Sequence, residues 1–430
     1  MVNKINLFSI IIYIGISISL FIDFFLNLDL SSGGSSADFY NTLPAVINLL
    51  NFSFDGWSSS TRHFPLHYFL LSTMYRIFED EYYVRMFYTL ISTLIPILIF
   101  LNLKYLYKDT SYSKLLIFSS IILLLPFLRS SIVWSNAHAT GFIFFLCGNL
   151  FLQKFIYNTK KKNLFLSVLF LSFAVYSVQY YAILFLIFLA IIYEKFDLRI
   201  FVISLLFCFI TSIPGFYFLK ILPSSSDIPF AKNIFNVIMI NFSIYCFYLI
   251  SFFNKKSILL LLTNLKYNNH HKLIIISIML TSILGISFFD YGHEVGGGFF
   301  YKFSNIFFGN NYLFYFSSIV GSIIFIYLEK LNKKYVLKLL LVFATFFIMT
   351  SSYMIFQKYF EPLFILVCLF YLKSEFFYSI FQNKNIKFYE IPFTLFYNRK
   401  IGESKIKILK TIYLTLKIVL NNFFSILFKK

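Results

Sequence analysis

The polar and ionisable side chains in the first half of this chain are concentrated in residues 31–85, between two strongly apolar stretches. The segment opens SSGGSSADFYNTLP, continues through FDGWSSSTRHFPLHYF and ends EDEYYVR. In a protein with so little polar surface, such a concentration is the first place to look for a catalytic or binding site. Its candidate side chains are Asp38, Asp55, Arg62, His63 and His67.

Asp38 follows the flexible SSGGSS stretch, just after the first apolar segment. A carboxylate at a water boundary, partly removed from solvent, has a pKa suited to taking a proton from an acceptor hydroxyl. Aspartate is also a favoured helix N-cap, and FYNTLPAVINLL, which follows, has the character of a helix. The residues alone therefore leave two roles for Asp38, a general base or a helix cap.

His63 and His67 lie on either side of Pro65 in TRHFPLHYF, next to Arg62. Their spacing of four residues puts both imidazoles on one face if the segment is helical, although Pro65 favours a helix that begins there. Such a pair can bind a metal ion or a phosphate, and hydrogen bonding to lipid headgroups is the commoner role. No third ligand is evident, which disfavours a metal site.

A second group of candidates lies near the end of the apolar region, where Lys358 and Tyr359 precede Glu361 and Pro362. If the basic breaks of the chain face the cytoplasm, these residues lie on the opposite side of the membrane, where lysine is disfavoured. Binding of an anionic ligand is one explanation for a lysine there. Contact between a snorkelling side chain and lipid phosphate is the other. The same two explanations apply to Arg129.

The composition places the chain among multi-pass membrane proteins. Its 430 residues are 59% hydrophobic and only 13% charged, with a mean hydropathy of +0.78, which excludes an ordinary soluble domain. The formal net charge of +19 comes mostly from lysines in short breaks between apolar runs. Cytoplasmic retention of positive charge explains these lysines, so no nucleic-acid partner is expected. The four cysteines lie within apolar runs and lack CxxC spacing, as buried small residues do.

Apolar segments of about 20 residues, the length that crosses roughly 30 Å of hydrocarbon, recur along the chain. The predicted fold is an all-α polytopic membrane protein with about 12 spans, within a range of about 11 to 13. A transmembrane domain over 1–376 is followed by a basic, amphipathic cytoplasmic tail over 377–430. The expected spans are 6–28, 86–105, 113–130, 138–157, 163–178, 180–194, 200–221, 234–253, 272–289, 311–329, 335–354 and 360–376.

The run 64–78 is apolar enough to suggest one more span, but the lysines argue against it. If 64–78 does not cross and the N-terminus is inside, basic breaks such as 158–163 and 329–338 all face the cytoplasm. We therefore expect 64–78 to form an amphipathic helix at the outer membrane surface, within a large external loop over 31–85 that contains juxtamembrane helices.

Taken together, these features resemble the GT-C superfamily of integral-membrane glycosyltransferases, in particular the bacterial group related to protein mannosyltransferases and to the enzymes that add aminoarabinose to lipid A. Members share a first span, a large external loop with an early acidic residue, a histidine- or lysine-proline segment and a short xxxVR element. The corresponding pieces here are ADFYNTL with Asp38, HFPLHYFLL with His63 and Pro65, and EYYVRMFYTLIS with Arg85. QKYFEP at 357–362 is similar to an RYxxP-like element near the family's C-terminal end.

The resemblance implies a GT-C-like fold that transfers a sugar from a polyprenyl-phosphate carrier to a glycan, lipid or protein acceptor. The reaction would take place on the external, periplasmic face of a bacterial inner membrane, in cell-envelope glycan or polysaccharide biosynthesis. Asp38 takes the role of base or acceptor positioner. The substrate-binding candidates are Arg62, His63, His67, His138, Lys358 and Tyr359.

This chain departs from the family pattern at three positions. Many relatives carry Asp-Glu at the first-loop site, where this chain has Asp38-Phe39. Many relatives carry a second aspartate before the fourth span, where this chain has SNAHATG with His138, and some carry a lysine where SVQYY places Gln179. The residues therefore name no cofactor, and a divalent metal ion stays open.

Two other functions are compatible with a chain of this kind. An O-antigen or polysaccharide polymerase or ligase also has about twelve spans, but it places its key loops later in the chain and relies on arginines there. A non-enzymatic flippase or transporter of lipid-linked glycans is expected to carry charged residues at mid-membrane depth, and these spans have almost none. The early loop pattern favours sugar transfer over both.

Overall fold

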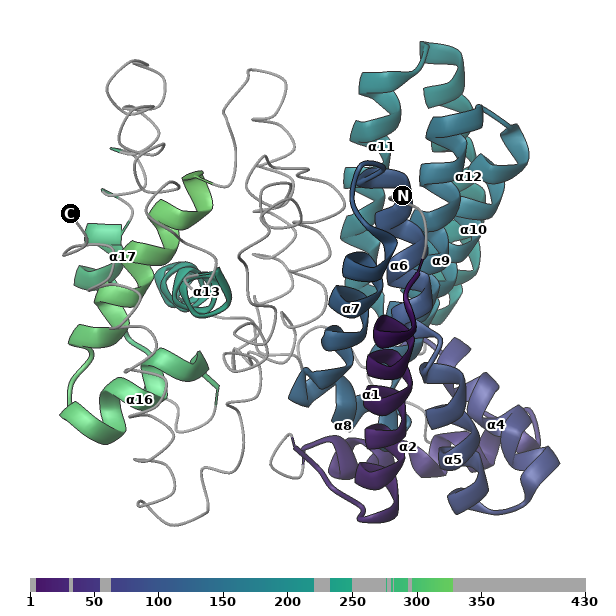
Figure 1. The fold of residues 1–430 in the computed structure, drawn as a ribbon, viewed down its shortest axis with the longest axis horizontal. Helices are drawn as coiled ribbons and strands as arrows, with labels where there is room; N and C mark the ends of the chain where they lie inside the picture. Colours follow the sequence, from purple (N-terminus) through teal and green to yellow (C-terminus); the bar gives the residue numbers. More distant parts are fainter. Residues whose placement is uncertain are drawn as a thin grey trace. The chain divides into compact units, whose positions relative to one another are not determined.

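The computed structural model describes residues 5–30, 34–54, 63–219, 233–249, 276, 280, 282–292 and 296–327. Within these ranges every regular element is a helix (Figure 1). The chain divides into two compact units, unit 1 built around Met1–Ile228 and unit 2 around Pro229–Val336. The predicted spans 335–354 and 360–376 and the predicted tail lie outside the described residues.

Unit 1 combines one long N-terminal helix, a group of short helices and a series of apolar helices joined by short turns. In chain order its elements are α1 (Leu7–Phe25), α2 (Gly34–Leu50), α4 (Leu66–Phe78), α5 (Glu81–Ser92), α6 (Ile95–Leu106), α7 (Tyr112–Ile121), the 3-10 helix η1 (Ile122–Leu124), α8 (Pro126–Val133), α9 (Ala137–Asn158), α10 (Lys161–Ser177), the 3-10 helix η2 (Gln179–Ile183), α11 (Leu184–Lys195) and α12 (Leu198–Leu219).

Several of these helices begin at polar caps that the sequence supplies. The Asn6 side chain accepts a hydrogen bond from the Ser9 N–H at 3.0 Å at the start of α1. Asp80, the residue before α5, accepts a hydrogen bond from the Tyr82 N–H through its carboxylate at 2.6 Å. Each cap satisfies a backbone donor that the first helical turn leaves without an intrahelical partner.

Four helical stretches in the described part of the chain are long and apolar enough to cross a membrane: Leu7–Phe25, Glu81–Leu106, Ala137–Asn158 and Leu198–Phe218. A fifth crossing is made if the pair Tyr112–Leu124 and Phe127–Val133, bent by 73°, counts as one broken span. These stretches coincide with predicted spans. The full count of about twelve stays a prediction, because the remaining described helices are shorter, as α10 is with 17 residues.

The run 64–78 forms a separate helix, α4, as the lysine distribution predicts. Its 13 residues extend about 20 Å at 1.5 Å per residue, which is too short to cross a bilayer. One face is buried, through His67, Tyr68, Leu71 and Ser72, while Ile77 is exposed. The expectation of a short amphipathic helix is confirmed, and its position at the membrane surface stays a prediction.

The two ends of unit 1 differ in charge. The Asn6 N–H donates to Ser113 Oγ at 2.9 Å, which puts the start of α1 beside the start of α7. This end, which we call the basic end, also contains the α6–α7, α9–α10 and α11–α12 turns (Figure 1). Its basic residues are Lys104, Lys108, Lys114, Lys154, Lys160, Lys161, Lys162, Lys195 and Arg199.

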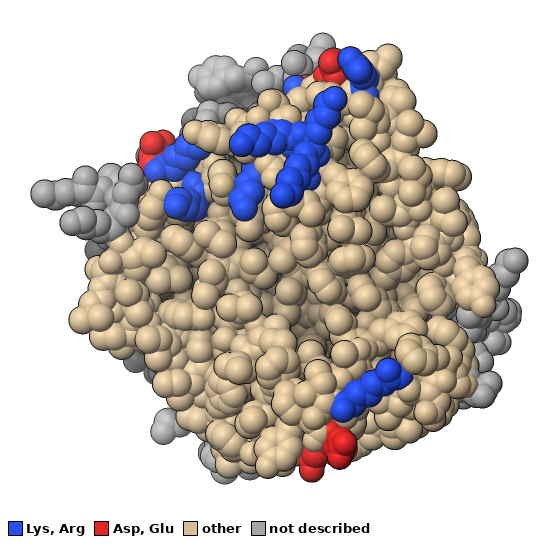
Figure 2. Space-filling view, turned by 90° about the vertical axis from the view of Figure 1, so that its right-hand side faces the viewer, with Lys and Arg blue, Asp and Glu red and all other residues tan. Residues whose placement is uncertain are grey.

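The opposite end of unit 1, which we call the loop end, contains α2, α4 and α8 (Figure 1). The 3-10 helix η2 also lies there, because its Gln179 contacts His63 just before α4. Figure 2 shows lysine and arginine gathered at one end of the face in view, with a broad belt free of charged side chains between them and a few charges at the other end. Such a belt between polar ends is expected of helices that cross a bilayer.

Helices α9 and α10 approach closely where α9 carries glycine. A methyl group added at Gly148 would lie 2.9 Å from Leu171 Cγ, and one at Gly141 would lie 3.4 Å from the Ala174 carbonyl oxygen, both in α10. Ser167 Oγ also donates to the Gly148 carbonyl oxygen at 2.8 Å. Small residues that let two backbones approach are the usual packing device between membrane helices.

Unit 2 contains α13 (Ile234–Leu249), α16 (Gly298–Phe308) and α17 (Tyr312–Tyr327). Helices α13 and α17 meet at Gly321, where an added methyl group would collide with the Phe242 carbonyl. The glycines at 296–298 all have positive φ, between 76° and 80°, so glycine is required in the turn that begins α16. This backbone conformation explains why three consecutive glycines occur here.

Candidate functional site

His63 and His138 meet at the loop end of unit 1. Their ring centroids are 5.3 Å apart in an edge-to-face arrangement. His63 lies just before α4, and His138 is the second residue of α9. Both side chains are only partly buried. The chain thus brings together two titratable groups that are 75 positions apart in the sequence (138 minus 63).

The start of η2 supplies a partner to each of these histidines. His63 Nδ1 lies 3.0 Å from Gln179 Oε1, and His138 Nδ1 lies 2.7 Å from the Tyr180 hydroxyl. The His138 and Tyr180 rings are also stacked, with centroids 5.7 Å apart and an interplanar angle of 22°. We call these four residues the outer histidine cluster. Its members come from the α4 entry, α9 and η2.

A second, buried set of polar groups lies behind the outer cluster. His67 Nδ1 is 2.8 Å from Thr140 Oγ1, which is in turn 2.7 Å from the Tyr88 hydroxyl. The Tyr88 hydroxyl also donates to the Asn136 carbonyl oxygen at 3.0 Å. His67 is 1% exposed, so it has no direct access to solvent. This chain of hydrogen bonds joins α4, α5 and the start of α9, and it supports the outer cluster from beneath.

Burial sets the charge state of His67. Its pKa is lowered from 6.5 to about 3, first by removal from water and second by the nearby His63, while a hydrogen bond to the Ser135 backbone acts in the opposite direction. His67 is therefore neutral near pH 7. A neutral, buried imidazole acts as a hydrogen-bonding support and does not attract an anion by charge.

The two first-loop histidines do not share a helical face. Helix α4 begins at Leu66 with Pro65 as its N-cap, so His63 lies outside the helix and His67 within its first turn. The spacing of four residues predicts a common face only if both positions are helical. Because the helix begins only after Pro65, His63 is not helical, and the two rings contact different partners, Gln179 and Thr140.

Asp38 is not a helix N-cap, which corrects one of its two predicted roles. Helix α2 begins earlier, at Gly34, and the Asp29 carboxylate accepts a hydrogen bond from the Ser36 N–H at 2.7 Å. The SSGGSS stretch thus contributes residues to the helix itself. Asp38 lies in the second turn of α2 and is exposed.

Contacts on either side of Asp38 hold α2 against the α8–α9 turn. The Ser35 carbonyl oxygen accepts from Asn136 Nδ2 at 3.3 Å, and the Phe39 ring lies 6.3 Å from that of Trp134. Asn136 also accepts from Tyr88 through its backbone. Asp38 and the histidines are thus carried by elements that all pack on this one turn.

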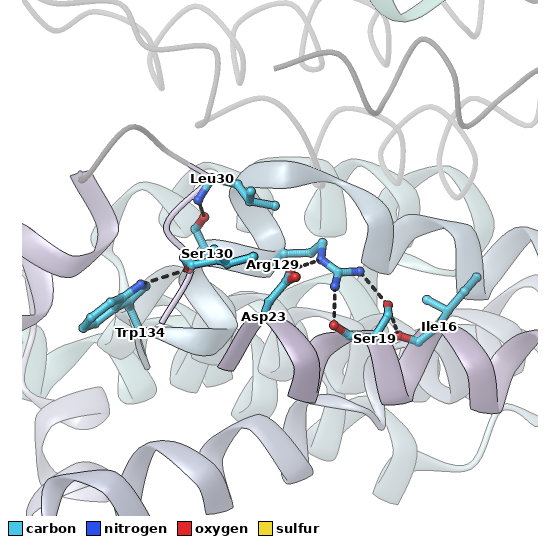
Figure 3. A network of polar contacts seen from close by, with 8 residues as sticks. Ile16, Ser19, Asp23, Leu30, Arg129, Ser130 and Trp134 are labelled. Carbon is cyan, nitrogen blue, oxygen red and sulfur yellow. Dashed lines mark hydrogen bonds and ion pairs between the residues drawn. The ribbon is translucent and has the colours of Figure 1, made fainter. Parts of the chain in front are cut away.

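Arg129 is a buried structural group, which corrects the expectation of a ligand or lipid contact. Its Nε lies 2.6 Å from Asp23 Oδ2, and its two terminal nitrogens donate to the Ser19 hydroxyl and carbonyl at 3.0 and 2.7 Å (Figure 3). Ser130 Oγ accepts from the Leu30 N–H at 2.7 Å in the same network. Helix α8 therefore contacts both α1 and the segment between α1 and α2, which includes Leu30. The sequence signal was Asp23, an acidic residue inside an apolar run.

Arg85, the arginine of the xxxVR element, also makes structural contacts. It is 4% exposed and donates to the Val133 carbonyl oxygen and to Asn27 Oδ1, both at 3.1 Å. Its guanidinium carbon lies 3.8 Å from the centre of the Trp134 ring, a cation–π geometry. Arg85 thus joins α5 to the end of α1 and to the α8–α9 turn.

The remaining predicted site residues are not placed. Asp55, Arg62, Lys358 and Tyr359 lie outside the described residues. In the part of the chain that the structure describes, no group of three or more His, Cys, Asp or Glu side chains is arranged to hold a metal ion. The sequence reasoning missed Gln179, Tyr180, Tyr88 and Thr140 as parts of the site. The polar break SVQYY between two apolar runs was the available signal for the first two.

Comparison with known proteins found no matching protein-family model, no matching curated protein and no matching solved structure. The fold and the site define the protein as a helical protein with several helices long and apolar enough to cross a membrane and a histidine cluster at one end.

Proposed function

We propose that this chain is a membrane glycosyltransferase of the GT-C type, which moves a sugar from a polyprenyl-phosphate carrier to an acceptor in cell-envelope glycan or polysaccharide assembly. The loop end faces the periplasm or exterior of a bacterial inner membrane, and the basic end faces the cytoplasm. The charge difference between the two ends supports this orientation, because lysine and arginine are retained in cytoplasmic loops.

One observation supports the proposal most directly. The pieces that carry the resemblance, namely α2 with Asp38, the HFP segment with His63 and the VR element with Arg85, all pack around the α8–α9 turn. Segments that are separated in the sequence thus come together at one end of unit 1. A transfer reaction needs such a place, where a lipid-borne donor and an acceptor meet.

The proposed reaction forms a bond between the anomeric carbon and an acceptor oxygen and breaks the bond between that carbon and the donor phosphate oxygen. The acceptor hydroxyl loses a proton, which Asp38 accepts or helps to orient for removal. The phosphate leaves with the bonding electron pair and gains negative charge. His138, and His63 in its protonated form, can stabilise this charge through N–H donors, as preorganised donors do at developing oxyanions.

The test is release of polyprenyl phosphate by purified protein in nanodiscs supplied with a panel of polyprenyl-phosphate sugars and with acceptor membranes. Asp38→Asn is expected to lower the rate by about 100-fold or more, the usual contribution of a general base. Asp109→Asn changes another exposed aspartate, at the basic end, and serves as the matched control, which should retain the wild-type rate. A folded Asp38→Asn protein that transfers at the wild-type rate would contradict the role of Asp38. If no donor supports transfer, a polymerase, ligase or flippase function is favoured instead.

A further inference from the structure

The element η2 (Gln179–Ile183) contacts both histidines of the outer cluster through consecutive residues. It is also firmly held. Tyr181 is 2% exposed and its ring lies against Gly141 of α9, where no Cβ intervenes. Val178, which precedes η2, is fully buried. The side chains of Gln179 and Tyr180 therefore project from a fixed backbone toward His63 and His138.

The partner of His63 determines which of its ring nitrogens carries the proton. Gln179 presents its carbonyl oxygen, Oε1, at 3.0 Å from His63 Nδ1. An amide oxygen only accepts hydrogen bonds, so Nδ1 must be the donor. A neutral imidazole has a single N–H, and in neutral His63 the lone pair then lies on Nε2.

Tyr180 acts on His138 mainly through geometry. Its hydroxyl can donate or accept, so it satisfies His138 Nδ1 in either tautomer. The stacked Tyr180 ring fixes the plane of the imidazole, and the Phe127 ring contacts it at 5.5 Å. His138 is thereby held edge-to-face with His63.

We propose that Gln179 is a positioning residue that holds His63 in the Nδ1–H tautomer, so that Nε2 is the nitrogen that gains and loses the second proton. Tyr180 positions His138 beside it. The identity of the molecule that meets Nε2 rests on the proposed function: in sugar transfer, it is the departing phosphate. Nε2 is a proton acceptor when His63 is neutral and an N–H donor to phosphate when His63 is charged.

The groups that face His63 act on its titration in known directions. His138 faces it from α9 and is itself hydrogen-bonded to Tyr180 of η2, and His67 in α4 is close enough to interact with it electrostatically. A positive charge on His138 disfavours a second charge on His63, whereas Gln179 is neutral and leaves the titration unchanged by charge. A carboxylate in place of Gln179 would favour the imidazolium form of His63.

The test uses nitrogen-15 and carbon-13 NMR of histidine-labelled full-length protein in nanodiscs, which contains six histidines. The His63 signals are assigned by their loss in His63→Ala. In the wild type we expect the Nδ1–H tautomer. Gln179→Leu should abolish that preference, and Gln179→Glu should raise the His63 pKa by about one unit or more. Gln153→Leu, which changes a buried glutamine of α9 outside the cluster, is the matched control and should leave His63 unchanged.

Two results separate this inference from the proposed function. If the His63 tautomer and titration follow the predicted changes but no donor supports transfer, the positioning role stands and the glycosyltransferase proposal fails. If transfer occurs but His63 shows the same tautomer and the same pKa in the wild type, Gln179→Leu and Gln179→Glu, the positioning role is overturned. Unchanged signals from the other histidines show that each variant is folded.

Discussion

At the residue scale, neighbouring histidines differ because their surroundings differ. His63 is partly buried and contacts groups of the outer cluster, whereas His67 is 1% exposed and contacts Thr140. Among the histidines in the described ranges, His63 and His138 have the exposure needed to meet a ligand and His67 does not. His67 instead ties α4 to α9 in its neutral form, because protonation would place a charge in a site that burial makes unfavourable.

His67 should make the stability of the protein depend on pH. Its pKa is about 3 in the folded protein and about 6.5 when unfolded, so between these values only the unfolded state takes up the proton. The His67 contribution to the free energy of unfolding is therefore full above about pH 6.5 and falls by about 1.4 kcal/mol for each pH unit below it. Thermal denaturation of the detergent-solubilised protein at pH 7, 6 and 5 measures this loss.

The variant His67→Gln provides the control for that prediction. It keeps a polar side chain able to hydrogen bond to Thr140 and removes the titrating group. Its melting temperature should be lower than that of the wild type at pH 7 but should fall less steeply toward pH 5. Equal pH dependence in the two proteins would show that His67 is not held neutral by burial.

At the element scale, a single methyl group is enough to disturb the packing of α9 on α10. Gly148→Ala puts a Cβ 2.9 Å from Leu171 Cγ and 3.0 Å from the Leu171 backbone nitrogen, closer than carbon atoms normally approach. We expect the free energy of unfolding to fall by about 1–3 kcal/mol, the usual cost of overpacking. The melting temperature of purified protein measures the effect.

Gly15→Ala is the matched control, because Gly15 also lies in a long apolar helix but has nothing within 4 Å of an added Cβ. Alanine is the better helix former by about 0.5–1 kcal/mol, so this variant should match or exceed the wild type in stability. A Gly148→Ala protein as stable as Gly15→Ala would mean that α9 and α10 do not pack through their glycine face.

The sequence predicted the elements better than it predicted their contacts. Apolar length located α1, α9 and α12, and lysine distribution identified α4 as a helix that does not cross. These features are local, so a single stretch of residues carries them. The Gln179–His63 contact joins positions 116 residues apart, and no local pattern pairs a glutamine in a polar break with a particular histidine.

Helix starts were also hard to place from local pattern alone. Asp38 has the residue type of a cap, yet the backbone is already helical from Gly34, and the Asp29 carboxylate accepts a hydrogen bond from the Ser36 N–H in the first turn. Likewise, Arg129 looked like an external cation because the sequence does not show that Asp23 comes within 2.6 Å of it. Residue types set what is chemically available, and tertiary packing selects among the partners.

At the scale of the whole molecule, the charge difference between the ends of unit 1 should fix its orientation. We predict that Lys161, at the basic end, is cytoplasmic and that Asn41, on α2, is external. In a variant without native cysteines, a membrane-impermeant maleimide should label Asn41→Cys in intact cells and Lys161→Cys only after permeabilisation. The reverse pattern would place the histidine cluster in the cytoplasm and remove the periplasmic site from the proposal.

The buried pair of Asp23 and Arg129 also constrains how the protein is made. The two residues are 106 positions apart, so at about 5–20 residues per second the ribosome adds Arg129 roughly 5 to 20 s after Asp23. During that interval the carboxylate in the first helix has no guanidinium partner, and an unpaired charge is costly to bury. The end of α1 can therefore reach its final position only once α8 has been synthesised. The loop end of unit 1 is completed late, although its first residues emerge early.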